Sequence, residues 1–158
     1  MPNYLDAARG LPNASQPLPN LITAGQPDKA DLQALMAAGV KIILDLRAQS
    51  EWRWMDEPDQ ARAQGFTYYN VPVGPTPLND DLMNQILAVL RKHKDEPMLF
   101  HCKSANRVGG AILPFLILDE RMEEEDAVGA AQRIGLRSRE YLEWGLDYAR
   151  RHRQAHGA

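Results

Sequence analysis

The segment HCKSANRVGG, from His101 to Gly110, holds the single cysteine of the chain, Cys102, with Arg107 five positions after it. An apolar stretch precedes the cysteine and two glycines follow the arginine, which indicates a strand, a short loop and the start of a helix. The first amides of a helix have no partner within it and its dipole is positive there, so this junction binds anions and stabilises a thiolate. Arg107 adds a planar cation that can hold two oxygens of a phosphate. These residues predict a nucleophilic thiolate beside an anion site.

Strands that alternate with helices must position this loop. Strands are expected at 21–24, 40–46, 66–73 and 97–102, and helical segments at 28–39, 48–64, 108–119, 123–134 and 138–153. A further helix is expected to begin at an N-cap of Asn79 or Asp80, with an apolar stripe that runs from Leu82 to Leu90. This alternation predicts a single α/β domain with a mainly parallel central sheet flanked by helices. Asp28 is the expected N-cap of the first helix and Gly39 its C-cap, and Pro114 should kink or end the helix after the cysteine loop.

The first 20 residues carry four prolines and little periodic apolar content, so we expect an extended N-terminal arm at 1–20 before a domain at 21–158. A length of 158 residues suits one domain, and 44% hydrophobic residues can form a substantial core. The single cysteine excludes an internal disulfide. The formal net charge of −3 predicts no general attraction to nucleic acid or anionic membranes.

No apolar run reaches the ~18 residues of a membrane span, so no span is expected. The N-terminal sequence lacks the regions of a signal peptide. We therefore expect a cytoplasmic protein, or a periplasmic one if a signal peptide has been removed. The spacing of His93, His152 and His156 fits no metal site, and no metal ion is expected.

Three stretches together resemble the bacterial beta-lactamase-hydrolase-like phosphatase family, within the dual-specificity and protein tyrosine phosphatase-like superfamily. They are AGQPDKADLQALMAAGVKIILDLR, the VPV that ends the third expected strand, and HCKSANRVGG. The resemblance covers residues 21 to about 145. It implies a protein tyrosine phosphatase-like fold and a phosphoric monoester hydrolase that needs no cofactor.

The resemblance also implies the roles of the loop residues. Cys102 would attack phosphorus to form a cysteinyl phosphate, which water would then hydrolyse. Arg107 and the loop amides would hold the phosphate oxygens, and His101 would support the loop. The phosphate-binding residues implied are Lys103, Ser104, Ala105, Asn106, Arg107 and Val108. The expected substrate is phosphotyrosine, in a phosphorylated protein, or a similar small aryl phosphomonoester.

The sequence departs from the family pattern at three places. Four residues separate Cys102 from Arg107, as in the nearer family, whereas the mainstream phosphatases have five. Ala105 stands where the family loop has glycine, and Val108 lacks the hydroxyl that mainstream enzymes carry after the arginine. The loop after VPV has no aspartate at the usual place of the general acid, which leaves Asp80 and Asp81 as candidates; Asp80 could instead cap the next helix.

Two other functions fit the same residues. A rhodanese-type sulfurtransferase also uses a cysteine at the start of a six-residue loop. An anion-binding or phosphoprotein-binding module with weak or no catalysis would fit Ala105, Val108 and the absence of the usual aspartate. Asp45 and Arg47 lie at the end of an expected strand, on the same side of the sheet as Cys102. They could form a structural ion pair or support the chemistry in the pocket. The sequence predicts neither the natural substrate nor the oligomeric state.

Overall fold

The computed structural model describes residues 3–51, 56–74 and 77–155. They form a five-stranded sheet of order β1-β2-β5-β3-β4, in which only the β1–β2 pair is antiparallel. The strands are β1 (Ser15–Leu18), β2 (Leu21–Ala24), β3 (Ile42–Asp45), β4 (Thr67–Asn70) and β5 (Met98–His101). The helices are α1 (Lys29–Ala37), α2 (Glu57–Ala63), α3 (Asp80–Lys92), α4 (Asn106–Pro114), the π-helical turn η1 (Phe115–Asp119), α5 (Glu124–Ile134) and α6 (Arg139–Ala155). The predicted single α/β domain with a mainly parallel sheet is confirmed.

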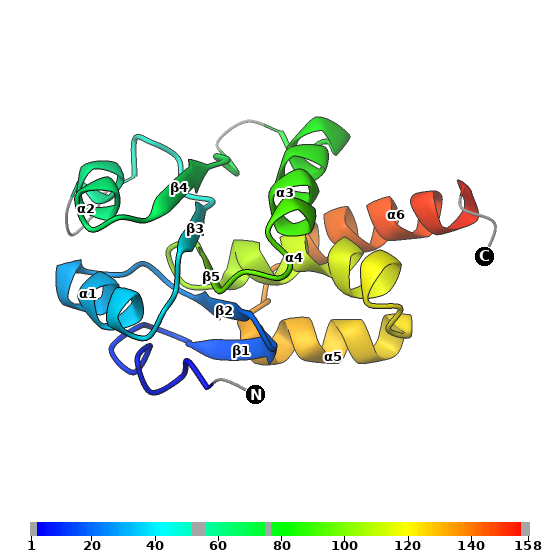
Figure 1. Ribbon diagram of the computed structural model, residues 1–158. Helices are drawn as coiled ribbons and strands as arrows, with labels where there is room; N and C mark the ends of the chain where they lie inside the picture. The colour runs from blue at the N-terminus through cyan, green and yellow to red at the C-terminus, as the bar shows by residue number, and fades with distance from the viewer. Residues whose placement is uncertain (1–2, 52–55, 75–76, 156–158) are drawn as a thin grey trace.

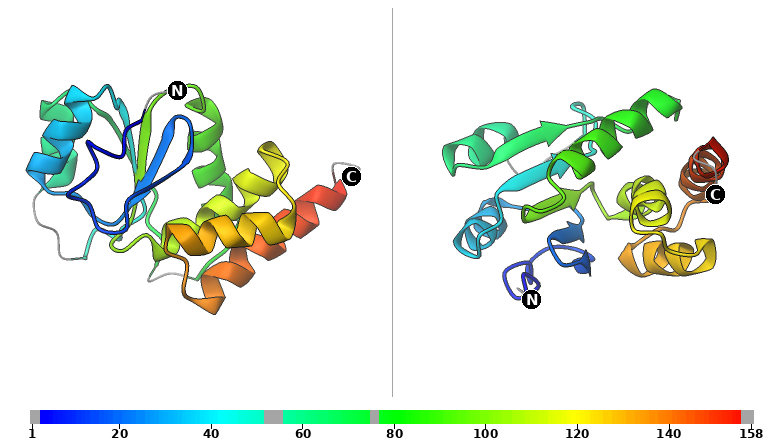
Figure 2. Two further views of the ribbon diagram at one scale, coloured as in Figure 1. Left: turned by 90° about the horizontal axis from the view of Figure 1, so that it is seen from below. Right: turned by 45° about the vertical axis from the view of Figure 1, so that its right-hand side comes forward.

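Each face of the sheet carries its own hydrophobic cluster. Successive side chains of a strand point to opposite faces, so β3 and β5 contribute to both clusters. Ile43 and Leu99 pack with residues of α1 and α2, whereas Leu44 and Phe100 pack with residues of α3 to α6. Figures 1 and 2 show α1 and α2 apart from the group formed by α3, α4, α5 and α6.

The strand register brings the carboxyl ends of the parallel strands to one level. Ala24 is paired with His101, His101 with Asp45, and Asp45 with Asn70, which makes one row across β2, β5, β3 and β4. Ligand sites of parallel α/β sheets form at this edge. The cysteine loop begins directly after His101, so the fold places it there.

Local signals in the sequence explain where several helices begin and end. Asp28 caps α1 in a capping box with Asp31, and Gly39 follows that helix with φ of 103°. Asn79, rather than Asp80, caps α3 by accepting a hydrogen bond of 2.9 Å from the backbone N–H of Leu82. The expectation for Pro114 is confirmed, since α4 ends there and continues as a π-helical turn.

The N-terminal segment is packed more closely than an extended arm. Tyr4, Ala8 and Leu11 are buried, and their spacing suits the turns that run from residue 4 to residue 11. β1 then pairs with β2 as an edge strand of the same sheet. Within the described ranges, no helix is long and apolar enough to cross a membrane.

Candidate active site

Cys102 lies at the end of β5 and α4 begins four residues later, which confirms the predicted strand, loop and helix. The cysteine is 1% exposed, and its backbone N–H donates a hydrogen bond of 3.3 Å to Ala24. Ala105, the residue before α4, has φ of 70° in the left-handed region and is fully buried. The loop therefore needs a positive φ where the family pattern has glycine, and alanine there costs about 1 kcal/mol or more.

Two consecutive carbonyl groups of the loop are held by the scaffold behind it. His101 Nδ1 lies 3.2 Å from the carbonyl oxygen of Cys102. The backbone N–H of Gln26 donates a hydrogen bond of 3.1 Å to the carbonyl oxygen of Lys103. In a trans peptide the N–H points opposite to the C=O. The N–H groups of Lys103 and Ser104 are consequently directed away from this scaffold, as an anion cradle requires.

The segment between α5 and α6 holds the other side of the loop. Asn106 Oδ1 accepts hydrogen bonds from the backbone N–H groups of Arg137 and Ser138 at 2.7 and 3.1 Å. Arg137 also donates to the hydroxyl of Ser104. Gly135 packs so tightly that a Cβ added there would lie 3.0 Å from the Cβ of Ala105. The segment before α6 therefore fixes the start of α4.

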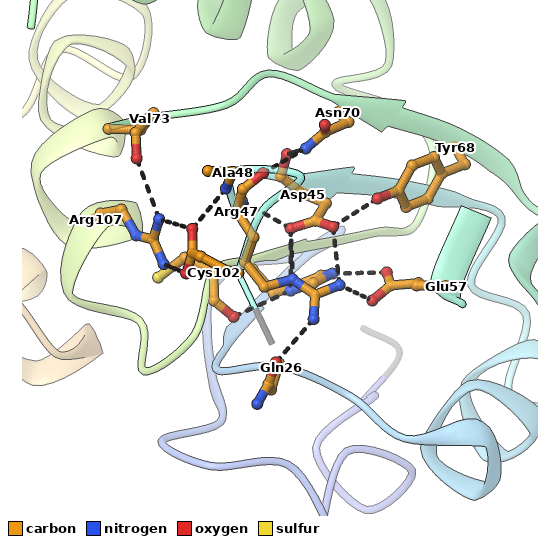
Figure 3. A network of polar contacts seen from close by, with 12 residues as sticks. Gln26, Asp45, Arg47, Ala48, Glu57, Tyr68, Asn70, Val73, Cys102 and Arg107 are labelled. Atoms are coloured by element: carbon orange, nitrogen blue, oxygen red, sulfur yellow. Dashed lines mark hydrogen bonds and ion pairs between the residues drawn. The ribbon is translucent and has the colours of Figure 1, made fainter. Parts of the chain in front are cut away.

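Arg107 projects from the first turn of α4 toward the end of β3. Its two terminal nitrogens donate to the two carboxylate oxygens of Glu51 at 2.6 and 2.7 Å, and Nη1 also donates to the carbonyl oxygen of Val73 at 3.1 Å. The backbone N–H of Ala48 donates to the same carboxylate. Figure 3 shows this clamp beside Cys102.

The clamp leaves Arg107 charged and able to hold an anion. Burial lowers the pKa of Arg107, but the hydrogen bonds to Glu51 and the charge of Cys102 outweigh it and raise that pKa. For Glu51, the hydrogen bonds from Arg107 and Ala48 outweigh burial and lower the pKa. The hydrogen bonds found for Arg107 within the described chain use only its terminal nitrogens, so Nε is available to an anion.

A fully buried network of charges lies behind the cysteine loop (Figure 3). Arg47 donates to both oxygens of Asp45, to Glu57 and, at 2.8 Å, to the side chain of Gln26. His101 Nε2 lies 2.7 Å from Glu57. Ligand-type atoms of Asp45, Glu57 and His101 lie within 4.8 Å of one another, and Arg47 already serves both carboxylates as their cationic partner.

The network shifts the pKa of its members strongly. Burial raises the pKa of Asp45, but His101 and Arg47 outweigh it and lower that pKa to about 2. Burial lowers the pKa of His101, but the charges of Glu57 and Asp45 and the hydrogen bond to Glu57 raise it above 6.5. Tyr68 donates to Asp45 as well, and Asn70 holds the carbonyl groups of Asp45 and Arg47.

Solved structures with the same arrangement of elements identify the fold. A DUF442 protein from Shewanella putrefaciens CN-32, described as a phosphatase, is 18% identical over 93% of this chain and 97% of its own, with a TM-score of 0.78. Tk-PTP in its active form is 17% identical over 89% and 98%, with a TM-score of 0.72. The catalytic core of the PP-IP phosphatase SIW14 from S. cerevisiae is 16% identical over 92% and 94%, also with a TM-score of 0.72.

The chain has the protein tyrosine phosphatase-like fold. No family model and no curated protein matches its sequence. The likeness to the protein tyrosine phosphatase-like structures is one of fold.

The protein tyrosine phosphatase-like fold brings together His101, Cys102 and Arg107, as the sequence predicts. The two candidate acids differ in their contacts. Asp80 is bound to Arg151 of α6 at 2.7 and 2.8 Å, which lowers the pKa of Asp80. Asp81 lies exposed in the first turn of α3, and the described part of the chain shows no ion pair for it.

Sequence reasoning missed the two glutamates that contact the predicted site residues. Glu51 lies in a turn that follows β3, and Glu57 is the first residue of α2. Neither belongs to a motif at fixed spacing from Cys102. Only the placement of Asp45 and Arg47 at a strand end indicated that charges gather at this edge, and the structure makes these two residues an ion pair.

Proposed function

We propose that the chain is a cysteine-dependent phosphatase acting on phosphotyrosine or similar aryl phosphomonoesters, in phosphorylated proteins or small molecules. The observation that carries the proposal is the meeting of Cys102 with the inward-facing guanidinium of Arg107 at a strand–loop–helix junction. The loop carbonyls held from behind support it, since they turn loop amides toward the space in front.

The proposed reaction has two steps. The Cys102 thiolate attacks phosphorus, an S–P bond forms, and the P–O bond to the leaving group breaks with its electron pair on oxygen. Water then attacks phosphorus, and the S–P bond breaks to release phosphate and the thiolate. Arg107 and the amides of residues 103–108 would stabilise the charge on the phosphate oxygens in both transition states. No metal ion or organic cofactor takes part in these steps.

We propose that Asp81, rather than Asp80, protonates the leaving group. Asp80 is bound by Arg151, and an ionised, paired carboxylate is a poor proton donor. Aryl leaving groups depart with little help from an acid, which favours aryl over alkyl phosphates as substrates. Val108 supplies no hydroxyl for the departing thiolate, so we expect slow turnover of the intermediate.

Hydrolysis of para-nitrophenyl phosphate tests the proposal, with Cys102→Ser as the control variant. We expect turnover by the wild-type chain and none by the variant. Release of thiocyanate from thiosulfate and cyanide would instead identify a rhodanese-type sulfurtransferase. Binding of phosphate without turnover in either assay would leave the anion-binding module.

A further inference from the structure

With both carboxylates ionised, the charges buried behind the cysteine loop balance only if His101 is protonated. Asp45, Arg47, Glu57 and His101 are each at most 1% exposed. Two carboxylates face one guanidinium and one imidazole, so an imidazolium makes the group neutral. Unpaired charges are costly in such surroundings, which favours the neutral arrangement.

Hydrogen bonding at the two ring nitrogens of His101 leads to the same protonation state. Nε2 lies 2.7 Å from a carboxylate oxygen of Glu57, and Nδ1 lies 3.2 Å from the carbonyl oxygen of Cys102. A carbonyl oxygen and an ionised carboxylate can only accept, and a neutral imidazole has one N–H. Both contacts are hydrogen bonds only when both nitrogens carry protons. Asp45, 3.8 Å from Nδ1, and Arg47 are the other charged groups facing the ring.

This imidazolium contacts the cysteine loop through a hydrogen bond. Its Nδ1–H holds the carbonyl group of Cys102 and so fixes the direction in which the N–H of Lys103 points. It also places a positive charge one residue from the sulfur. Arg47 reaches the next carbonyl group of the loop through Gln26, whose side chain it bonds and whose backbone N–H bonds Lys103.

We propose that Glu57 is a positioning residue of the active site, which keeps His101 doubly protonated and thereby holds the loop and supports the Cys102 thiolate. Glu57 accepts from both cations of the network and reaches them from α2, whereas Asp45 and His101 are the last residues of β3 and β5. The role in catalysis rests on the proposed phosphatase function. The effect on the thiol does not depend on turnover.

Alkylation of Cys102 by iodoacetamide across pH tests the proposal on the folded, full-length chain. Glu57→Gln keeps the shape of the side chain and removes its charge, so His101 should lose a proton. We expect the midpoint of alkylation to move upward by about one pH unit, which slows alkylation about tenfold at pH values below both midpoints. Tyr68→Phe is the matched control, because it removes a hydrogen bond to Asp45 and leaves the charge of the network unchanged.

An unchanged midpoint in Glu57→Gln, or an equal shift in Tyr68→Phe, would overturn the proposal. If Glu57→Gln does not fold, the ring nitrogens of wild-type His101 decide the question by NMR at pH 7. Two protonated nitrogens support the proposal and a neutral tautomer overturns it. A chain with the expected midpoint shift and no turnover of para-nitrophenyl phosphate would refute the phosphatase function alone.

Discussion

Arg107 and Glu51 form a bidentate ion pair, with nitrogen–oxygen distances of 2.6 and 2.7 Å, beside the single cysteine of the chain. The carboxylate is itself held by the backbone N–H of Ala48. The pair connects the turn after β3 to the first turn of α4. It sets the plane of the guanidinium through the two terminal nitrogens, and the hydrogen bonds of the described residues leave Nε unused. The positioning of Arg107 therefore depends on a residue outside the cysteine loop.

Replacing Glu51 by Gln should release Arg107 from this position. A displacement of about 1 Å in a charged clamp can cost about 100-fold in rate, so we expect kcat/KM on an aryl phosphate to fall by about that factor. Glu143→Gln is the matched control, since its ion pair with Arg139 is exposed and weak. Full activity of Glu51→Gln would mean that Val73 alone positions Arg107.

Gly135→Ala should damage both the fold and the loop. Gly135 has φ of 144°, and an added Cβ would lie 3.0 Å from Ala105. We expect a loss of about 2–3 kcal/mol in the free energy of unfolding, together with reduced activity. Gly39→Ala shares the positive φ but meets nothing within 4 Å, so it should lower stability and leave activity per folded molecule intact. Equal loss of activity in both variants would contradict the role of Gly135.

Stability should fall on both sides of a plateau in pH. The pKa of His101 is raised above 6.5 in the folded chain, so the folded state binds more protons than the unfolded state from pH 6.5 upward. The free energy of unfolding therefore falls as pH rises through that window, by up to about 1.4 kcal/mol for each unit of the raised pKa.

The opposite holds for Asp45, whose pKa is lowered from 3.8 to about 2. The unfolded state binds more protons in that interval, so this contribution to stability is lost as pH falls from 3.8 to 2. Urea denaturation from pH 2 to 10 measures the free energy of unfolding across both the acidic and the basic loss of stability. A stability that rises continuously from pH 6.5 to 9 would contradict the protonation of His101.

The two aspartates at the start of α3 should behave differently. Asp81→Asn should slow the hydrolysis of an alkyl phosphate by about 100-fold and that of an aryl phosphate much less, because only the alkyl leaving group needs a proton. Asp80→Asn should change neither rate, since Arg151 holds that carboxylate. If neither variant alters the rates or their pH profiles, the proton donor is another group.

The elements of the fold were predictable because each has a local cause. The apolar run at 40–46 predicts β3, the capping residues Asp28 and Asn79 predict where α1 and α3 begin, and Pro114 predicts where α4 ends. β1 was not predictable, because its residues carry no alternating pattern and it forms only by pairing with β2.

The site was predictable only where its residues are adjacent in sequence. His101, Cys102 and Arg107 lie within one motif, so their meeting follows from a strand, a loop and a helix. Glu51 and Glu57 reach the site through the path of the chain after β3, which no periodicity specifies. The positive φ of Ala105 likewise depends on how Gly135 and Asn13 pack and bond around the loop.

A rapid-quench reaction with an aryl phosphate, followed by mass spectrometry of the peptide that contains Cys102, tests the cysteinyl phosphate directly. We predict one phosphoryl group on Cys102 during turnover, absent from Cys102→Ser, which should have no activity. Undiminished turnover by Cys102→Ser, with no modified peptide in the wild-type chain, would contradict it.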